Sequence, residues 1–156
     1  MGVKKTWQEK LRDRKDLPKI EPIPPKMRAR WGTGTMVVPA PEEVDEIMRA
    51  VPHGKLITIN QIRARLAKKH RTTIACPMTT GIFAWIAANA ADERAGAGGT
   101  DITPYWRTLK SDGELNPKYP GGVEALSQKL AAEGHRVVRK GKRYVVADHD
   151  KSLVEG

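Results

Sequence analysis

Segments with the spacing of amphipathic helices, followed by two strand-like runs, constrain the fold of this chain more than any other feature. The spacing of apolar residues predicts helices over about 41–51 and 59–69. The second helix has Thr58 as its N-cap and Gln61 three residues later, which is a capping-box arrangement. An alanine-rich apolar run over 79–91 predicts a third helix, and a helix that is apolar all round is normally buried.

A fourth helix and a hairpin complete the pattern. Residues 121–134 have apolar positions at helical spacing and end in Gly134, a common helix stop. Residues 135–148 read as two strands joined at Gly141, with a basic tip formed by Arg139, Lys140, Lys142 and Arg143. This order predicts a mainly α fold with a small β-hairpin, arranged as a winged helix-turn-helix-like single domain.

The chain divides into three parts by composition. Residues 1–35 hold ten basic and four acidic side chains, a net charge of +6, and four prolines fall within residues 17–26. We expect a short helix near the start of this basic, Pro-rich arm and extended polyproline geometry after it. The arm is either a solvated tail or a nucleic-acid-binding segment. Residues 36–148 form the predicted domain, entered by a short strand within 31–39, and residues 149–156 a C-terminal tail.

The formal charge of +10 over 156 residues favours a polyanionic partner, nucleic acid first. The densest basic group of the predicted domain is a candidate patch for contacts with a DNA backbone. It consists of Arg63, Arg65, Lys68, Lys69, His70 and Arg71.

Cys76 is the single cysteine, so the chain can form neither an internal disulfide nor a cysteine-based zinc site. The N-terminus lacks the apolar core of a secretory signal, and no apolar run reaches membrane-spanning length. We therefore expect a cytoplasmic protein in a reducing compartment, with no membrane association, metal or cofactor.

Two segments resemble a known family. HGKLITINQIRARL is similar to the start of the helix-turn-helix in the O6-alkylguanine-DNA alkyltransferases. PYWRTLKSDGELNPKYPGGVEALSQKLAAEGH resembles that family's active-site segment and the helix after it, with matched internal spacing over about 30 residues. The resemblance covers roughly residues 41–135.

The resemblance places Tyr105 where the family has its nucleophilic cysteine and Trp106 where it has the histidine that removes the thiol proton. Glu133 corresponds to the carboxylate of the same relay. Alkyl transfer needs a thiolate, and a tyrosine with a pKa near 10 is a poor substitute. The resemblance therefore implies the alkyltransferase-like branch, which binds alkylated bases in DNA without repairing them.

The resemblance also implies a base-binding pocket. Tyr105 and Trp106 would form an aromatic wall on which an extruded base stacks. The bordering loop would consist of Asn116, Tyr119, Gly121 and Gly122. Arg107 either contacts phosphate or keeps the structural role of the family's arginine. If Tyr105 and Trp106 instead fill space, the old pocket has become core, and the turn-rich segment NPKYPGG favours the open pocket.

The sequence departs from the family at two positions used in base extrusion. Ile59 replaces the tyrosine that rotates the base, and Met78 lies near the position of the arginine that fills the gap. Met78 is either an apolar wedge or, as is commoner for methionine, a core residue. Thr79 and Thr80 are candidate helix caps and, with their helix, candidate contacts to DNA.

Three functions remain open from the sequence. The favoured one is a non-enzymatic protein that binds double-stranded DNA at modified bases as a monomer and works with excision-repair proteins. The second is a winged-helix module for nucleic-acid or protein contact. The third is a true alkyl acceptor that uses Cys76, although most lone cysteines are simply small buried residues.

Incubation with a duplex containing O6-methylguanine should leave the mass of the intact protein unchanged, because Tyr105 replaces the thiol. Intact-mass spectrometry checks this, with an active alkyltransferase as the positive control. An added methyl group that peptide mapping places on Cys76 would show that the protein is an enzyme.

Overall fold

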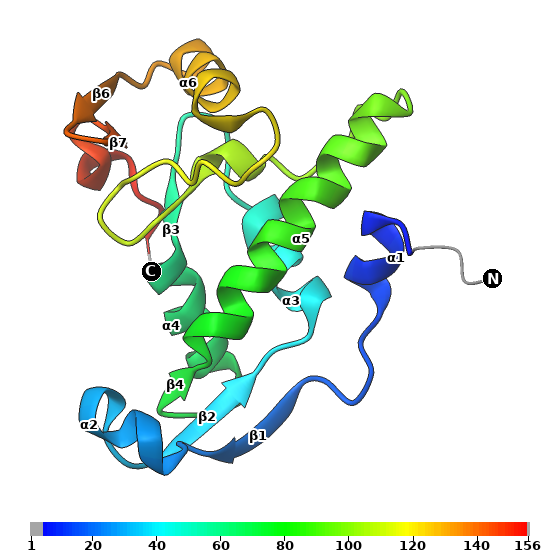
Figure 1. Ribbon diagram of the computed structural model, residues 1–156, viewed down its shortest axis with the longest axis vertical. Coiled ribbons are helices and arrows are strands. Elements are labelled where there is room, and N and C mark those ends of the chain that lie inside the picture. The colour runs from blue at the N-terminus through cyan, green and yellow to red at the C-terminus, as the bar shows by residue number, and fades with distance from the viewer. Residues whose placement is uncertain (1–4, 156) are drawn as a thin grey trace.

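About half of the chain is helical in the computed structural model, which describes residues 5–155 (Figure 1). The long helix α5 (Pro77–Gly96) runs diagonally across the molecule, with α3 (Pro41–Arg49) against it and α4 (Ile59–His70) leading to its start. The predicted helical segments and the terminal hairpin are therefore confirmed.

Local sequence accounts for where α3 and α4 begin. The Thr58 hydroxyl accepts a hydrogen bond from the Gln61 amide at 3.2 Å, and the Gln61 side chain accepts one from the Thr58 amide at 3.0 Å. The capping box predicted at α4 is thus present. At α3, Glu43 folds back to accept the Ala40 amide at 2.8 Å, and Pro41 occupies the first turn.

Helix α5 differs from its prediction in its start and in its burial. Its N-cap is Cys76, so Thr79 and Thr80 are not caps but lie inside the first turn. The alanines of one side are buried, yet Met78, Ile82 and Trp85 remain exposed on the other side. The expectation of a wholly buried helix was wrong, because neighbouring elements cover only one side of it.

The basic arm is packed onto the rest of the chain. Strand β1 (Lys19–Pro22) pairs antiparallel with β2 (Thr35–Val38), which pairs in parallel with β4 (Ile74–Ala75). Residues 19–22 of the expected polyproline stretch form this strand, and its single proline, Pro22, is tolerated because β1 is at the sheet edge. The predicted division at residues 35/36 falls inside this hydrogen-bonded sheet.

Two short helices of the arm lie close to α5. Helix α1 (Trp7–Arg12) packs on α5, where the rings of Trp7 and Trp85 meet edge to face at 4.8 Å. The Glu93 carboxylate accepts the amides of Trp7 and Gln8, each at 3.2 Å, and so caps α1 from outside. A 3₁₀ turn, η1 (Pro25–Met27), leads into α2 (Arg28–Trp31) near the start of α5.

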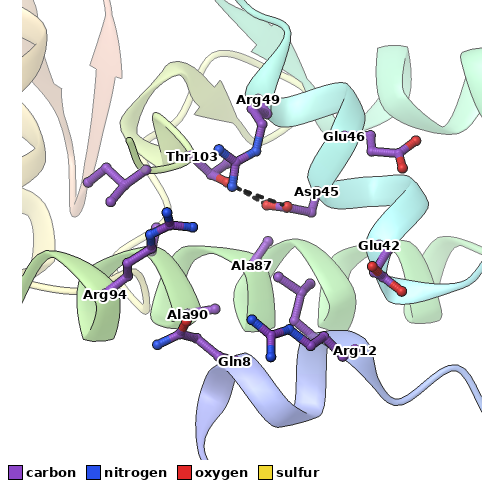
Figure 2. A pocket seen from close by; sticks show the side chains of 13 residues that line it. Gln8, Arg12, Glu42, Asp45, Glu46, Arg49, Ala87, Ala90, Arg94 and Thr103 are labelled. Carbon is purple, nitrogen blue, oxygen red and sulfur yellow. Dashed lines mark hydrogen bonds and ion pairs between the residues drawn. The ribbon is translucent and has the colours of Figure 1, made fainter. Parts of the chain in front are cut away.

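A charged hollow of about 170 Å³ lies where α1, α3 and α5 meet (Figure 2). Thr103 donates a hydrogen bond to Asp45, and burial raises the pKa of this carboxyl group. Both signs of charge line the hollow, from Arg12, Arg49, Arg94, Glu42 and Glu46. This balance of charges does not favour the binding of a polyanion. The hollow lies where the arm packs against α3 and α5.

The C-terminal third begins with a 3₁₀ turn, η2 (Tyr105–Arg107), followed by β5 (Thr108–Leu109), which pairs in parallel with β3 (Ile57–Thr58). Helix α6 (Gly122–Ala132) leads to the hairpin of β6 (Val137–Lys140) and β7 (Arg143–Val146). The end of the chain contains η3 (His149–Ser152) and returns to the start of α4. There the Val154 amide donates to Leu56, and Gln61 donates to the Val154 carbonyl, both at 2.8 Å.

Candidate nucleic-acid interface

Tyr105 lies in the main hydrophobic core. It is 3% exposed, and its ring meets those of Trp106 and Tyr119 edge to face at 5.4 and 6.3 Å. Burial raises the pKa of both tyrosine hydroxyls, which further disfavours a phenolate nucleophile. The open pocket expected at Tyr105 is not found, because Tyr119 from the following loop is buried against it.

Trp106 and Arg107 are tied to Glu133 at the end of α6. The Trp106 indole donates to Glu133 at 2.7 Å, and Arg107 donates through Nε at 2.9 Å and through Nη2 at 2.8 Å. Arg107 also donates to the Val51 carbonyl at 2.7 Å, while the Gly54 amide donates to Glu133 at 3.2 Å. Arg107 therefore has the structural role, because each of its three guanidinium nitrogens already donates within the protein.

The electrostatics of Glu133 follow from these contacts. Burial alone would raise its pKa, but the hydrogen bonds from Arg107, Trp106 and Gly54 outweigh burial and hold the pKa below its ordinary value. Of the residues that correspond to the relay in the resemblance, Trp106 donates to Glu133, Glu133 is ion-paired with Arg107, and Tyr105 is buried in the core.

The predicted pocket loop is a tight turn that leads into α6. Asn116 accepts the Lys118 amide on its side chain at 3.0 Å and the Tyr119 amide on its carbonyl at 3.1 Å. Gly121 has a φ of +81°, and a Cβ there would lie 2.4 Å from the Cβ of Ala125. Gly121 therefore has a steric reason to be glycine, and Gly122 follows it with a φ of +67°. The loop presents Asn116 and Lys118 to the surface beside α5.

The outer side of α5 forms an exposed apolar row. Met78, Ile82 and Trp85 are 74%, 46% and 36% exposed, at positions i, i+4 and i+7 of the helix. With Pro77, Gly81, Asn116 and Lys118 they line a groove of about 450 Å³. Met78 is therefore a surface residue, and the alternative that placed it in the core was wrong.

Thr79 and Thr80 point back into the protein. Thr80 is fully buried and donates to the Cys76 carbonyl at 2.7 Å, and Thr79 donates to the Cys76 sulfur at 2.9 Å. Cys76 itself is 9% exposed. These contacts assign all three residues to the first turn of α5, and they place Cys76 among the small buried residues.

The basic residues of α4 do not form one patch. Consecutive positions on a helix point in different directions, so a run of charges in sequence spreads around the axis. Lys69 and His70 contact the buried Glu43 at 2.8 and 2.6 Å, and Arg65 donates to the Glu155 carbonyl at 2.6 Å. Lys68 and Arg71 are exposed, whereas Arg63 is buried. The single backbone-contacting patch is therefore corrected to separate groups.

The residues that line the α5 groove include three that sequence reasoning missed, namely Ile82, Trp85 and Lys118. The signal was available for two of them. Bulky apolar side chains at i, i+4 and i+7 in an otherwise small-residue helix mark a second face. At the hairpin tip, Arg139, Lys140 and Lys142 are exposed as expected, while Arg143 pairs with Asp112.

Within residues 5–155, no helix is both long and apolar enough to cross a bilayer. The same residues contain no cluster of three or more histidine, cysteine, aspartate or glutamate side chains placed to hold a metal ion.

Comparison with protein-family models and with curated proteins finds no match. Two solved structures are similar in fold: S. pombe Atl1 in complex with damaged DNA containing O6-carboxymethylguanine, and S. pombe ATL in complex with DNA. Each has a TM-score of 0.54 and 15% sequence identity, over 74% of this chain and 94% of the other. The chain has the fold of Atl1.

Tyr105→Ala should lower the free energy of unfolding by about 3 kcal/mol or more, because it leaves a cavity next to Tyr119 and Trp106. Thermal and urea unfolding measure this, with Tyr144→Ala in the half-buried hairpin as the matched control and a smaller loss expected there. If Tyr105→Ala has an unfolding midpoint close to that of the parent and selectively loses affinity for modified DNA, Tyr105 lines an open pocket after all.

Glu133→Gln should destabilise the protein by about 2 kcal/mol or more near neutral pH, because it leaves Arg107 without its counter-charge. A carboxyl whose pKa is lowered by folding contributes stability above its unfolded pKa and loses it as the pH falls through its folded pKa. The gap between parent and variant should therefore be full above about pH 4.5 and close below it.

Urea unfolding at several pH values tests the behaviour of Glu133, with Glu124→Gln on the exposed side of α6 as the control. A gap that stays constant down to pH 3 would show that the charge of Glu133 is not what stabilises the fold.

Proposed function

We propose that this protein binds double-stranded DNA and recognises alkylated or otherwise modified bases without transferring the alkyl group. The observation that carries the proposal is the exposed apolar row of Met78, Ile82 and Trp85 on α5, beside Lys118. An exposed apolar groove on a chain of charge +10 suits a ligand that combines flat apolar rings with phosphates.

The fold likeness supports this assignment. Both similar structures are complexes with DNA, one of them damaged by O6-carboxymethylation of guanine. In the proposed arrangement α4 and α5 act as a helix-turn-helix, and the hairpin of β6 and β7 acts as the wing with its exposed basic tip. Helix α5 then faces the DNA.

The modified base is proposed to bind in the α5 groove and not on Tyr105, which is buried. A groove of about 450 Å³ lies within the range of about 300–1,000 Å³ that small-molecule sites occupy. Trp85 offers a partly exposed ring for stacking, and Asn116 and Lys118 offer hydrogen-bond donors to the base edge or phosphate. Met78 is placed to act as the apolar wedge that separates neighbouring bases.

Binding without repair implies a later step. A protein that marks a modified base and leaves it in place needs partners that remove the lesion, and we propose excision-repair proteins for this role. The burial of Cys76 argues against the alternative of an alkyl acceptor, because a nucleophile must reach the alkyl carbon.

A second candidate is a winged-helix module that binds DNA with no preference for modified bases. The burial of Tyr105 and Tyr119 favours it, because the position of the family's reactive site is filled by side chains. The two candidates predict the same dependence on salt and differ only in their preference for a modified duplex.

Affinity for duplex DNA should fall as salt rises, because each neutralised phosphate releases roughly 0.9 counterion. Replacing an apolar residue of the groove, as in Ile82→Ser, should weaken binding about fivefold or more, the usual scale of a central interface contact. Fluorescence anisotropy with matched duplexes, one carrying O6-methylguanine, measures salt dependence, affinity and preference together.

Ile20→Ser is the matched control, since Ile20 is 55% exposed on β1 and lies outside the groove. Salt-independent binding, or equal effects of the two substitutions, would contradict the proposed interface. Equal affinity of the parent protein for both duplexes would favour the second candidate.

A further inference from the structure

A buried arginine without a counter-charge lies between α2, α4 and the start of α5. Arg63 is 9% exposed, and its Nε donates to the Ala75 carbonyl at 3.1 Å while Nη1 donates to the Asn60 side chain at 3.1 Å. Its guanidinium carbon lies 4.3 Å from the centre of the Trp31 ring. Among residues 5–155, no carboxylate lies within ion-pair distance of Arg63.

A second arginine shares the same ring. The guanidinium carbon of Arg30 lies 5.0 Å from the centre of the Trp31 ring, and in the described part of the chain this arginine is also without an acidic partner. Burial lowers the pKa of Arg63 and the charge of Arg30 also lowers it, while Cys76 acts in the opposite direction. Arginine nevertheless remains protonated in proteins. Both arginines line the same hollow, and two positive charges beside one hollow favour the binding of an anion there.

The surface beside these arginines is hollowed. Trp31, Asn60 and Arg63 line two neighbouring hollows of about 350 and 250 Å³. The larger one is also lined by Arg30, Ser111 and Pro77. Guanidinium, amide and hydroxyl groups are the donors that proteins use on phosphate oxygens.

The position of the larger hollow identifies which anion it suits. Pro77 lines both this hollow and the α5 groove, so the two are adjacent at the start of the helix. A duplex that lies along the outer side of α5 would carry its backbone past Arg30. DNA carries a phosphate at a fixed distance from each flat base, and so can occupy the hollow and the groove together. The acidic side chains of a protein have no such fixed spacing from an apolar ring.

We propose that Arg30, Arg63, Asn60 and Ser111 form a binding site for a backbone phosphate of DNA, with Trp31 holding the two guanidinium groups in place. This inference rests on the proposed function and adds the basic arm to the DNA interface. The arm supplies Arg30 and Trp31, while α4 supplies Arg63 and Asn60.

The test is the salt dependence of binding to a duplex without any modified base. Arg30→Ala should reduce the slope of log affinity against log salt by about 0.9 and weaken binding several-fold at low salt. Arg30 is exposed, so the substitution should leave the fold intact. Arg14→Ala is the control, because it removes the same charge from the arm at a site next to Glu42 and should leave the slope unchanged.

Arg63→Gln provides a second measurement and should reduce the slope in the same way, with its thermal midpoint recorded alongside. If Arg63→Gln unfolds the protein, the Arg30→Ala slope decides. Equal slopes for Arg30→Ala and the parent, or an equal loss in Arg14→Ala, would overturn the phosphate site.

The use of an unmodified duplex separates this inference from the recognition of lesions. If the parent binds DNA with a steep salt slope that Arg30→Ala does not change, the phosphate site fails and the proposed function stands. If the parent binds no duplex at low salt, the proposed function fails as well. Binding of polyglutamate that depends on Arg30, without such dependence for DNA, would assign the site to an acidic protein partner.

Discussion

The Glu133 carboxylate holds together the segments that surround Tyr105. It accepts hydrogen bonds from Trp106, from Arg107 and from the Gly54 amide, and thereby joins the end of α6, the turn η2 and the segment after α3. Arg107 extends the link to the Val51 carbonyl. Because a buried ion pair is stable only when its remaining donors and acceptors are satisfied, these contacts have to form together. Their geometry sets the position of Tyr105.

With η2 fixed in this way, the burial of Tyr105 follows. Its ring has to fill the space between Trp106 and Tyr119, and the loop that carries Tyr119 can close because Gly121 adopts a positive φ next to Ala125. A phenol ring is much larger than a thiol. Tyr105 therefore fills the space in which a smaller side chain would leave a cavity, and any base-sized site has to lie outside it.

The sequence predicted the elements whose causes are local. Thr58 and Gln61 mark the start of α4 by side-chain chemistry, and Gly141 marks the hairpin turn, so neither needs knowledge of the rest of the fold. The outer face of α5 could not be predicted in this way, because overall apolarity does not show which side the other elements cover. The prediction of a single basic patch on α4 was wrong for a related reason, since Arg63, Lys69 and His70 point toward different neighbours. The docking of the arm depends on contacts such as Trp7 with Trp85, which are distant in sequence.

Two pairs of aromatic residues have opposite surroundings. Tyr105 and Tyr119 are buried, whereas Trp31 and Trp85 lie near the surface beside arginine or lysine. Stacking on nucleic acid needs a ring face that solvent can reach, together with positive charge at the distance of a phosphate. Trp31 and Trp85 combine the two, whereas Tyr105 and Tyr119 do not. Both tryptophans are contacted by the arm or belong to it, so the arm shapes the surface on which DNA would bind. A basic segment that first reads as a tail thus becomes part of the proposed interface, because its tryptophans fix it to α4 and α5.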